Sequence, residues 1–324
     1  MIAPASRPHR RTRLIASLAV GLGSFGLALI FRLVLKQQSS DFDQIVIGAR
    51  RTLAGLTPYT ASPLPGLDWP IYYPMPALVL GLPFAAMSLA TAHAVFSGIS
   101  GGLFTWALSR DGDAKLFSLG TWPYILTVSL GQWGPLLMAT SGIPMIAWLV
   151  IAKPNLGLAL AAAYGTRWIR ARSLLVNAGA IGALLVISWF LRPHWFAEWR
   201  ALIRTPTPHI IVPLTAIGGP LLLLTLVRWR RPEARLIAAL ACVPQTFSSY
   251  DSLLVFLVPE TRREALLLVA GTMCATLAIA LLGTAPTYAE TVRRFAPVRI
   301  ALVYLPAVAI ILRRPNVDPG AQAG

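Results

Sequence analysis

Long apolar segments, separated by short polar or basic stretches, run through almost the whole chain. Continuous apolar runs of about 17–25 residues have the length that crosses the hydrocarbon core of a bilayer. About twelve such segments are expected, several of them shorter than a full crossing, over residues 14–35, 75–90, 91–108, 115–130, 133–149, 154–167, 173–191, 212–228, 235–249, 252–259, 265–283 and 299–312. The pattern predicts an all-α, polytopic membrane bundle of about 10–12 transmembrane helices.

The same pattern places nearly all of the chain in one domain. Residues 14–312 are expected to form a single integral membrane domain, between a basic cytoplasmic N-terminus (1–13) and a disordered cytoplasmic tail (313–324). The first apolar run is too long for a signal peptide and has no small-residue cleavage site before Lys36. We therefore expect a retained first span whose N-terminus lies inside.

Composition favours a membrane protein without a separate soluble module. The chain is 56% hydrophobic and 12% charged, and its mean hydropathy is +0.66. The net charge of +16 is not a nucleic-acid signature, because the arginines cluster at the ends of apolar segments, where they retain loops in the cytoplasm and meet anionic headgroups. Cys242 and Cys274 lie inside apolar segments and form neither a disulfide framework nor a metal-ligand pattern.

The basic clusters allow the topology to be assigned. With the N-terminus inside, the expected spans put most basic clusters in the cytoplasm, at residues 167–172, 228–235, 260–264 and 313–314, as the positive-inside rule requires. Arg293, Arg294 and Arg299 are the exception, because this count places them outside. The motifs GQWGP and AKPNLG interrupt the apolar runs between residues 115 and 167, so two passes, four passes or a re-entrant stretch fit there. The side on which Gln132 and Lys153 lie therefore stays open.

Two long loops are expected on the outer face. The first, residues 36–74, starts polar, continues as a short amphipathic helix (IVIGARRTLAGL) and then turns through several prolines. In the second, residues 192–213, Trp195 and Trp199 are expected at headgroup depth. Arg200 and Arg204 of the same loop would face lipid phosphates.

Two carboxylates open the first outer loop, in the sequence SSDFDQ. Acidic residues are scarce, 12 Asp and Glu against 28 Lys and Arg, so an aspartate at the mouth of a membrane bundle is a candidate for chemistry. Ser40 followed three residues later by Asp43 also resembles a helix capping box, and Asp41 would suit the first turn of that helix. Spacing alone favours this capping role and does not rank the two aspartates.

Three further motifs carry candidate site residues, namely Tyr73, Gln132, Lys153, Tyr250 and Asp251. Each has a structural alternative: the prolines after Tyr73 can start a helix, Gln132 can bond a neighbouring helix, and Lys153 can snorkel to an interface. An acid such as Asp251 is costly inside a membrane bundle unless it is paired or functional. The histidines at 93, 194 and 209 are expected to be ordinary packing or loop residues.

Taken in order, five segments of the chain resemble a known family. The segments are DFDQIVIGARRTLAGLTPY, YYPMPALVLGLPFAAMSLATAHAVF, GQWGPLLMA, IAKPNLGLAL and VPQTFSSYDSLLVFLVP. Their order and spacing, over roughly residues 15–280, resemble glycosyltransferase family 87 of the C-type superfamily of polyprenol-phosphate-sugar transferases. The chain departs from the family at Ile45, where a tyrosine is frequent, and around Asp251, where Ser249 and Tyr250 stand in place of Ser-Trp or His.

The resemblance implies a C-type glycosyltransferase-like membrane bundle in the plasma membrane. It implies transfer of a hexose, above all mannose, from a polyprenyl-phosphate donor to a lipid or glycan acceptor of the cell envelope on the outer face. By the same resemblance Asp41 is the catalytic base and Asp43 a secondary candidate, while Tyr73 and Lys153 match the family's Tyr-Pro and Lys-Pro motifs.

The chemistry of such a transfer fits these residues. One carboxylate can take the proton of the acceptor hydroxyl, and the phosphate leaving group requires a cationic clamp, for which Lys153 is preferred to Arg200 or Arg204. No cofactor, metal ion or nucleic-acid partner is expected. Two alternatives stay open: a transporter or flippase for a lipid-linked sugar, and an inactive membrane scaffold that would tolerate loss of Asp41.

Overall fold

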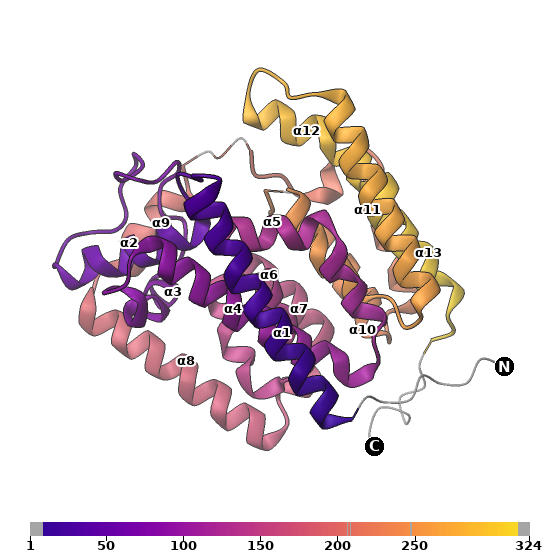
Figure 1. The fold of residues 1–324 in the computed structure, drawn as a ribbon, viewed down its shortest axis with the longest axis horizontal. Helices are drawn as coiled ribbons and strands as arrows, with labels where there is room; N and C mark the ends of the chain where they lie inside the picture. Colours follow the sequence, from indigo (N-terminus) through magenta and orange to yellow (C-terminus); the bar gives the residue numbers. More distant parts are fainter. Residues whose placement is uncertain (1–8, 206, 208, 247, 317–324) are drawn as a thin grey trace.

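The computed structural model describes residues 9–205, 207, 209–246 and 248–316. Within these residues the chain is helical and forms no β-strand, and an isolated antiparallel bridge joins Ile211 to Gln245. The predicted all-α class is confirmed (Figure 1). Residues 1–8 of the expected N-terminal segment and residues 317–324 of the expected tail lie outside the described residues.

The helices follow one another in the order α1 (Arg10–Leu29), η1 (Ile30–Val34), α2 (Asp41–Leu53), α3 (Met75–Leu80), η2 (Leu82–Phe84), α4 (Leu89–Leu108), η3 (Ser109–Asp111), η4 (Ala114–Gly120), α5 (Trp122–Leu130), α6 (Gly134–Ala139), η5 (Pro144–Ala152), α7 (Pro154–Trp168), α8 (Ala171–Leu191), α9 (Trp195–Ile203), η6 (Pro213–Thr215), η7 (Gly219–Arg228), α10 (Pro232–Cys242), η8 (Ser249–Leu257), α11 (Arg262–Leu282), α12 (Tyr288–Arg299), η9 (Ile300–Tyr304) and α13 (Leu305–Arg313). The η elements are 3-10 helices, except for η1 and η9, which are π-helical turns.

Four helices in the described residues are long and apolar enough to cross a bilayer. They are Arg10–Val34, Ala171–Leu191, Arg262–Leu282 and Tyr288–Arg313. A helix rises about 1.5 Å per residue, so 20 or more apolar residues match the hydrocarbon thickness. The chain is therefore a membrane protein. In Figure 1, α8 runs along one side of the molecule, and α11 and α13 lie together on the other.

The other expected spans are shorter or interrupted. Segment 75–90 divides into α3 and η2 before α4 begins, and segment 133–149 divides into α6 and η5. Prolines and glycines stand at these breaks, where the missing N–H or the flexible backbone ends a helix. Short helices of this kind are tolerated at membrane depth where protein surrounds them. The number of crossings beyond the four long helices stays a prediction.

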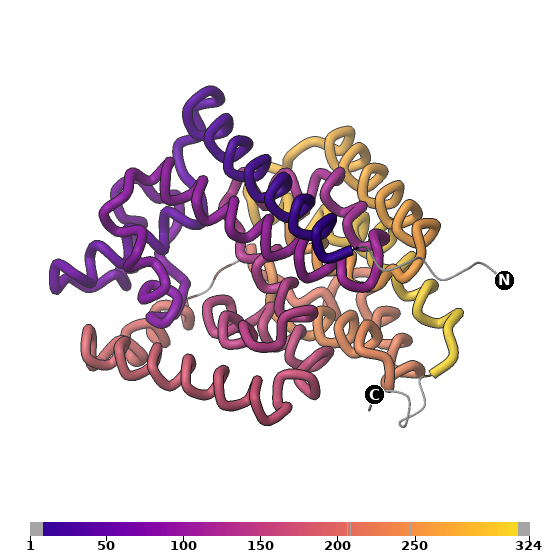
Figure 2. The backbone as a smooth tube through the Cα atoms, turned by 60° about the horizontal axis from the view of Figure 1, so that its bottom comes forward, coloured from indigo at the N-terminus to yellow at the C-terminus, as the bar shows by residue number. Residues whose placement is uncertain are grey.

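Small residues bring α1 and α4 into close contact. A Cβ atom added at Gly21 would lie 3.0 Å from the carbonyl oxygen of Gly98, and one at Gly98 would lie 3.2 Å from the carbonyl oxygen of Gly21. Small residues at helix crossings let two backbones approach, which is how membrane helices pack when lipid is as apolar as the interface. Helix α1 lies across the bundle in both views (Figure 1, Figure 2) and carries the chain to the start of α2.

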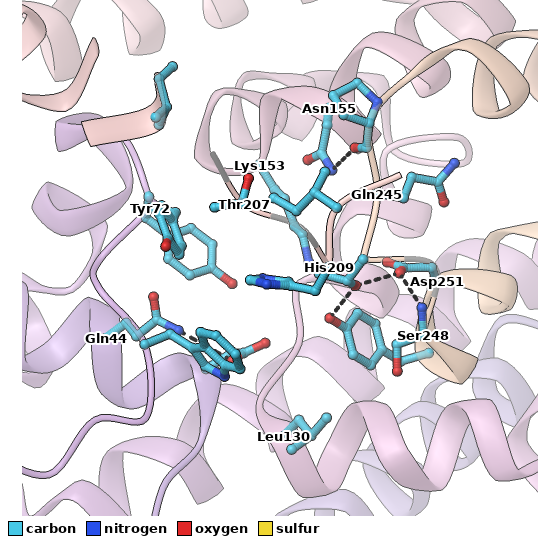
Figure 3. Close-up of a pocket in the computed structure, with 18 of the residues that line it drawn as sticks. Gln44, Tyr72, Leu130, Lys153, Asn155, Thr207, His209, Gln245, Ser248 and Asp251 are labelled. Carbon is cyan, nitrogen blue, oxygen red and sulfur yellow. Dashed lines mark hydrogen bonds between the residues drawn. The ribbon is translucent and has the colours of Figure 1, made fainter. Parts of the chain in front are cut away.

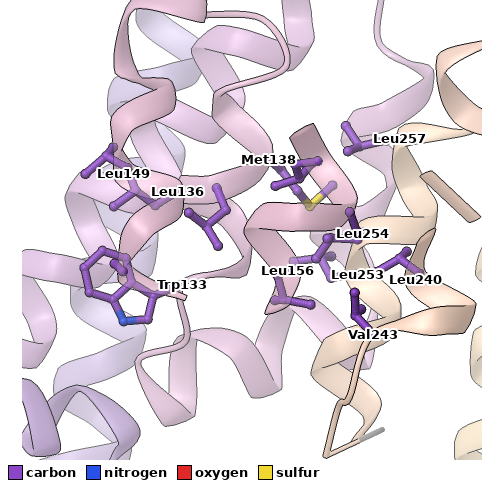
Figure 4. Close-up of a cluster of buried hydrophobic side chains, with 14 of the residues drawn as sticks. Trp133, Leu136, Met138, Leu149, Leu156, Leu240, Val243, Leu253, Leu254 and Leu257 are labelled. Carbon is purple, nitrogen blue, oxygen red and sulfur yellow. The ribbon is translucent and has the colours of Figure 1, made fainter. Parts of the chain in front are cut away.

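The central core joins α6, η5, α7, α10 and η8. Its buried side chains, shown in Figure 4, include Trp133, Leu136, Met138, Leu149, Leu156, Leu240, Val243, Leu253, Leu254 and Leu257. Because lipid is as apolar as this core, close van der Waals packing rather than removal from water holds these side chains together. The core thereby fixes the two chain segments that carry Lys153 and Asp251.

Candidate functional site

One large cavity gathers most of the predicted site residues. Its volume is about 790 Å³, within the range typical of small-molecule sites. Asp41, Tyr73, Lys153, Tyr250 and Asp251 all line it. Figure 3 shows Lys153 and Asp251 entering the cavity from separate segments. The structure thus brings together residues more than two hundred positions apart in the sequence.

The two neighbouring aspartates have different surroundings. The Oδ2 atom of Asp43 accepts a hydrogen bond from the backbone N–H of Ser40 at 2.9 Å, and lies 2.8 Å from Nη1 of Arg32. Its side chain is 1% exposed and does not line the cavity. Asp41 stands at the first position of α2, lines the cavity, and accepts a hydrogen bond from Nε2 of Gln44 at 3.3 Å. The expected capping box therefore belongs to Asp43, and Asp41 is the carboxylate that faces the cavity.

Burial raises the pKa of Asp41 to about 6. Loss of hydration disfavours the charged form of a carboxylate. The positive charge of Lys153 opposes this rise, while the negative charges of Asp251, Asp43 and Asp68 add to it. A carboxylate with a pKa near 6 is suited to proton transfer at neutral pH, because it is ionised there and still basic.

Lys153 is the sole Lys or Arg among the described residues that line the cavity. It precedes α7, and its Nζ donates a hydrogen bond to Oε1 of Gln132 at 2.7 Å. The same Nζ lies 5.2 Å from the ring centroid of Tyr250, within cation–π range. Gln132 itself does not line the cavity, so it acts on the site through Lys153. Arg200 and Arg204 do not line it either.

The backbone around Gln132 depends on the glycine before it. Gly131 ends α5 with a φ of +61°, in the left-handed region that glycine adopts without strain. A Cβ atom at this position would lie 2.8 Å from Cβ of Phe42 and 3.1 Å from Cδ2 of His93. The His93 ring contacts the carbonyl oxygen of Val128 through Nε2 at 2.7 Å, which is the packing role expected for it.

Asp251 is anchored by hydrogen bonds at the start of η8. Its Oδ2 accepts from Oγ1 of Thr246 at 2.8 Å and from the backbone N–H of Ser248 at 3.0 Å. The hydroxyl groups of Tyr250 and Thr246 are 2.7 Å apart. Burial raises the pKa of Asp251, and the charge of Lys153 opposes the rise. Asp251 thus accepts two hydrogen bonds of normal length, whereas Asp41 accepts a longer one from Gln44 at 3.3 Å.

Several residues that line the cavity were not among the predicted site residues. Gln44, Trp69, Trp199 and Tyr288 line the cavity, and so does His209, which was expected to be an ordinary loop residue. Trp199 was expected at headgroup depth; its Nε1 donates to the carbonyl oxygen of Tyr72 at 2.8 Å. Burial lowers the pKa of His209, which favours the neutral ring. Trp69 and His209 lie in loops and Tyr288 begins α12, where no periodicity marks a side chain that turns inward.

The described residues contain no group of three or more His, Cys, Asp or Glu side chains arranged to hold a metal ion. Comparison of the chain with known protein families, with curated proteins and with solved structures finds no match. The resemblance to glycosyltransferase family 87 accordingly stays a prediction.

Proposed function

We propose that the protein is a membrane glycosyltransferase that moves a hexose from a polyprenyl-phosphate donor to an acceptor hydroxyl, with Asp41 as the general base. The observation that carries the proposal is the position of Asp41: its carboxylate lines a large cavity, has a pKa near 6 and shares that cavity with Lys153. A base and a cation facing one space are what this transfer requires.

The reaction would proceed as a single displacement. The acceptor oxygen attacks the anomeric carbon of the donor while the bond from that carbon to the phosphate oxygen breaks. Asp41 takes the proton of the acceptor hydroxyl, and polyprenyl phosphate leaves with the bonding electron pair. One displacement inverts the anomeric configuration and needs no carboxylate nucleophile, which distinguishes it from retaining chemistry.

Lys153 is placed to stabilise the phosphate. Its ammonium group would interact with the charge that grows on the leaving oxygens, and its bond to Gln132 fixes its position before the donor binds. Apolar residues of the same cavity, among them Leu130, Leu158 and Ile203, supply surface for the first isoprene units. The long apolar helices keep the site at the membrane, where such a donor resides.

The family resemblance adds the finer points of the proposal. By it the hexose is mannose, the acceptor is a lipid or glycan, and the protein is a multi-pass component of the plasma membrane with the cavity open to the outer face.

Transfer in reconstituted vesicles tests the proposal. Wild type, Asp41→Asn and the matched control Asp113→Asn each receive polyprenyl-phosphate mannose and a lipid extract of the native host. Asp113 pairs with Arg262 and does not line the cavity. The readout is release of polyprenyl phosphate together with a new glycosylated product. Asp41→Asn is expected to lower the rate by a factor of about 10²–10⁴, and the control is expected to match wild type.

Equal rates for wild type and Asp41→Asn would exclude Asp41 as the base. Absence of product with all three proteins, accompanied by movement of the lipid-linked sugar between leaflets, would favour the transporter instead.

A further inference from the structure

Three aromatic rings from distant parts of the chain meet at the cavity. Trp69 lies in the first loop, His209 follows α9, and Tyr288 is the first residue of α12. The ring centroids of Trp69 and His209 are 4.5 Å apart, those of His209 and Tyr288 are 5.5 Å apart, and those of Trp69 and Tyr288 are 5.8 Å apart. All three side chains line the cavity. We call these residues the aromatic platform.

The three side chains of the platform differ in their exposure to solvent. His209 is 9% exposed, whereas Trp69 is 40% and Tyr288 is 45% exposed. In Figure 3 the His209 ring lies in the cavity between Tyr72 and Asp251. The buried histidine thus contacts two aromatic neighbours whose free surface is accessible to a ligand in the cavity.

The spacing of the rings decides how a ligand can bind. Centroid separations of 4.5–5.8 Å are contact distances between aromatic rings. No group fits between them, so the platform is not a cage that encloses a quaternary ammonium ion. A ligand has to lie on the outer surface of the joined rings.

The surrounding polar groups select the class of ligand. Asp68 precedes Trp69 in the sequence, and its carboxylate accepts a hydrogen bond from the hydroxyl of Ser39. The side chains of Asp68, Ser39 and Gln44 all line the cavity. An isoprenoid chain would desolvate these groups without replacing their hydrogen bonds, which is unfavourable. A pyranose places its C–H face on the electron-rich aromatic surface, and its hydroxyls donate to carboxylate and amide oxygens.

We infer that Trp69, His209 and Tyr288 form a pyranose subsite that receives a sugar ring of the transfer rather than an isoprenoid chain. The inference rests on the proposed function, in which donor and acceptor meet in this cavity. The platform carries a sugar ring, while Lys153 holds the phosphate of the donor.

Binding of small probes tests the subsite independently of catalysis. Saturation-transfer difference NMR on the full chain in nanodiscs is recorded with methyl α-D-mannopyranoside, methyl β-D-glucopyranoside and methyl β-D-galactopyranoside. Geranyl phosphate serves as the isoprenoid probe. The variants are Trp69→Ala, Trp69→Phe and Tyr288→Ala, and the control is Trp229→Ala, an exposed tryptophan that does not line the cavity.

We expect at least one of the pyranosides to bind wild type. Trp69→Ala and Tyr288→Ala each weaken its binding about fivefold to tenfold, because each removes one aromatic contact. Trp69→Phe retains a ring and recovers most of the affinity, Trp229→Ala matches wild type, and geranyl phosphate binding changes less than twofold in every variant.

Two results would overturn the inference: no pyranoside binds wild type, or Trp69→Ala weakens geranyl phosphate and leaves the pyranosides unchanged. Thermal stability of each variant in the nanodisc verifies that it is folded, and Tyr288→Ala carries the test if Trp69→Ala does not fold. Pyranoside binding without transfer in vesicles would uphold the subsite and reject the proposed function. In vesicles, a rise of the acceptor KM alone in Trp69→Ala assigns the sugar ring to the acceptor, and a rise of the donor KM alone assigns it to the donor. Transfer by Trp69→Ala at the wild-type rate, with both KM values unchanged, would reject the subsite and leave the proposed function standing.

Discussion

Nζ of Lys153 donates a hydrogen bond to Oε1 of Gln132 at 2.7 Å. The lysine ammonium group that lines the cavity is therefore positioned by a residue that does not line it. The sequence marks both residues, as the polar interruptions GQWGP and AKPNLG in apolar runs. The structure shows that the two interruptions meet. This contact explains why a glutamine and a lysine occur where a membrane protein otherwise avoids polar side chains.

Replacing Gln132 by Leu should weaken donor binding. The substitution removes the acceptor that positions Lys153 while it preserves the approximate size of the side chain. A hydrogen bond to a charged group contributes about 1.5–3 kcal/mol, so the KM for the lipid-phosphate donor should rise about tenfold. Steady-state transfer in vesicles measures this change. The KM for the acceptor should stay within twofold, and a selective rise in acceptor KM would contradict the assigned role.

The activity should depend on pH through Asp41. A general base acts in its ionised form, and the pKa of Asp41 is raised to about 6 by burial. We expect kcat/KM to fall about tenfold per pH unit below that value and to level off above it. Initial rates across this range measure the profile. A profile that stayed flat through pH 6 would count against Asp41 as the base.

The same group makes the stability depend on pH with a defined sign. The pKa of Asp41 in the folded state, about 6, lies above the ordinary aspartate value of 3.8. The folded state therefore binds more protons between these values, and its stability falls as pH rises through this window. Asp41→Asn removes the effect. The melting temperature of the variant relative to wild type should be higher at about pH 7.5 than at about pH 4. An equal difference at both pH values would contradict the raised pKa.

The extent to which the sequence predicts the structure varies along the chain. Helices α4, α8 and α11 begin within three residues of the expected starts at 91, 173 and 265, because long apolar runs end at polar or basic residues. The amphipathic helix in the first loop was also predicted, and α2 begins at Asp41 with the capping box of Ser40 and Asp43 that spacing favoured. The last span was expected from residue 299, yet it forms a continuous helix from Tyr288. Arg293 and Arg294 lie in the first part of this helix, and their charges lower its hydropathy, so the apolar pattern did not mark it as part of a span.

The parts of the site that were predictable are the rare ionisable residues and the motifs around them. Asp41, Lys153 and Asp251 are ionisable residues in an apolar chain, so they were recognisable without a structure. Spacing alone did not rank Asp41 above Asp43, and only the family resemblance did so, because the ion pair that occupies Asp43 involves Arg32, which comes from another helix. The aromatic platform was not predictable either, since its three rings come from separate segments and tryptophan and tyrosine are frequent in membrane proteins.

Replacing Asp43 by Asn should lower stability without removing chemistry. Asp43 and Arg32 form an ion pair in which the two side chains are 1% and 8% exposed. Removing one partner leaves the other charge buried, which costs about 3–5 kcal/mol. The melting temperature in detergent should fall well below that of Asp41→Asn. The rate per folded molecule should stay within a few-fold of wild type, and its complete loss would assign Asp43 to the reaction.

Arg314 should contribute more to stability than any exposed arginine nearby. Its Nη1 lies 3.0 Å from Oε1 of both Glu233 and Glu260, and its Nη2 lies 2.6 Å from Oε2 of Glu264. These contacts tie the end of α13 to the start of α10 and to the start of α11. Arg314→Ala leaves the buried Glu233 with Arg231 as its remaining ion-pair partner among the described residues, and should cost about 1.5–3 kcal/mol, the contribution of a hydrogen bond to a charged group.

The neighbouring Arg313 provides the matched control, because it is exposed and lies at the end of the same helix. Arg313→Ala should change the melting temperature by little, since an exposed charge contributes about 0–1 kcal/mol. Double replacement of Arg314 and Glu233 by Met and Gln should recover part of the loss, because it removes the cation together with the most buried of its partners. Equal melting temperatures for Arg314→Ala and Arg313→Ala would show that the cluster does not hold the C-terminal helix in place.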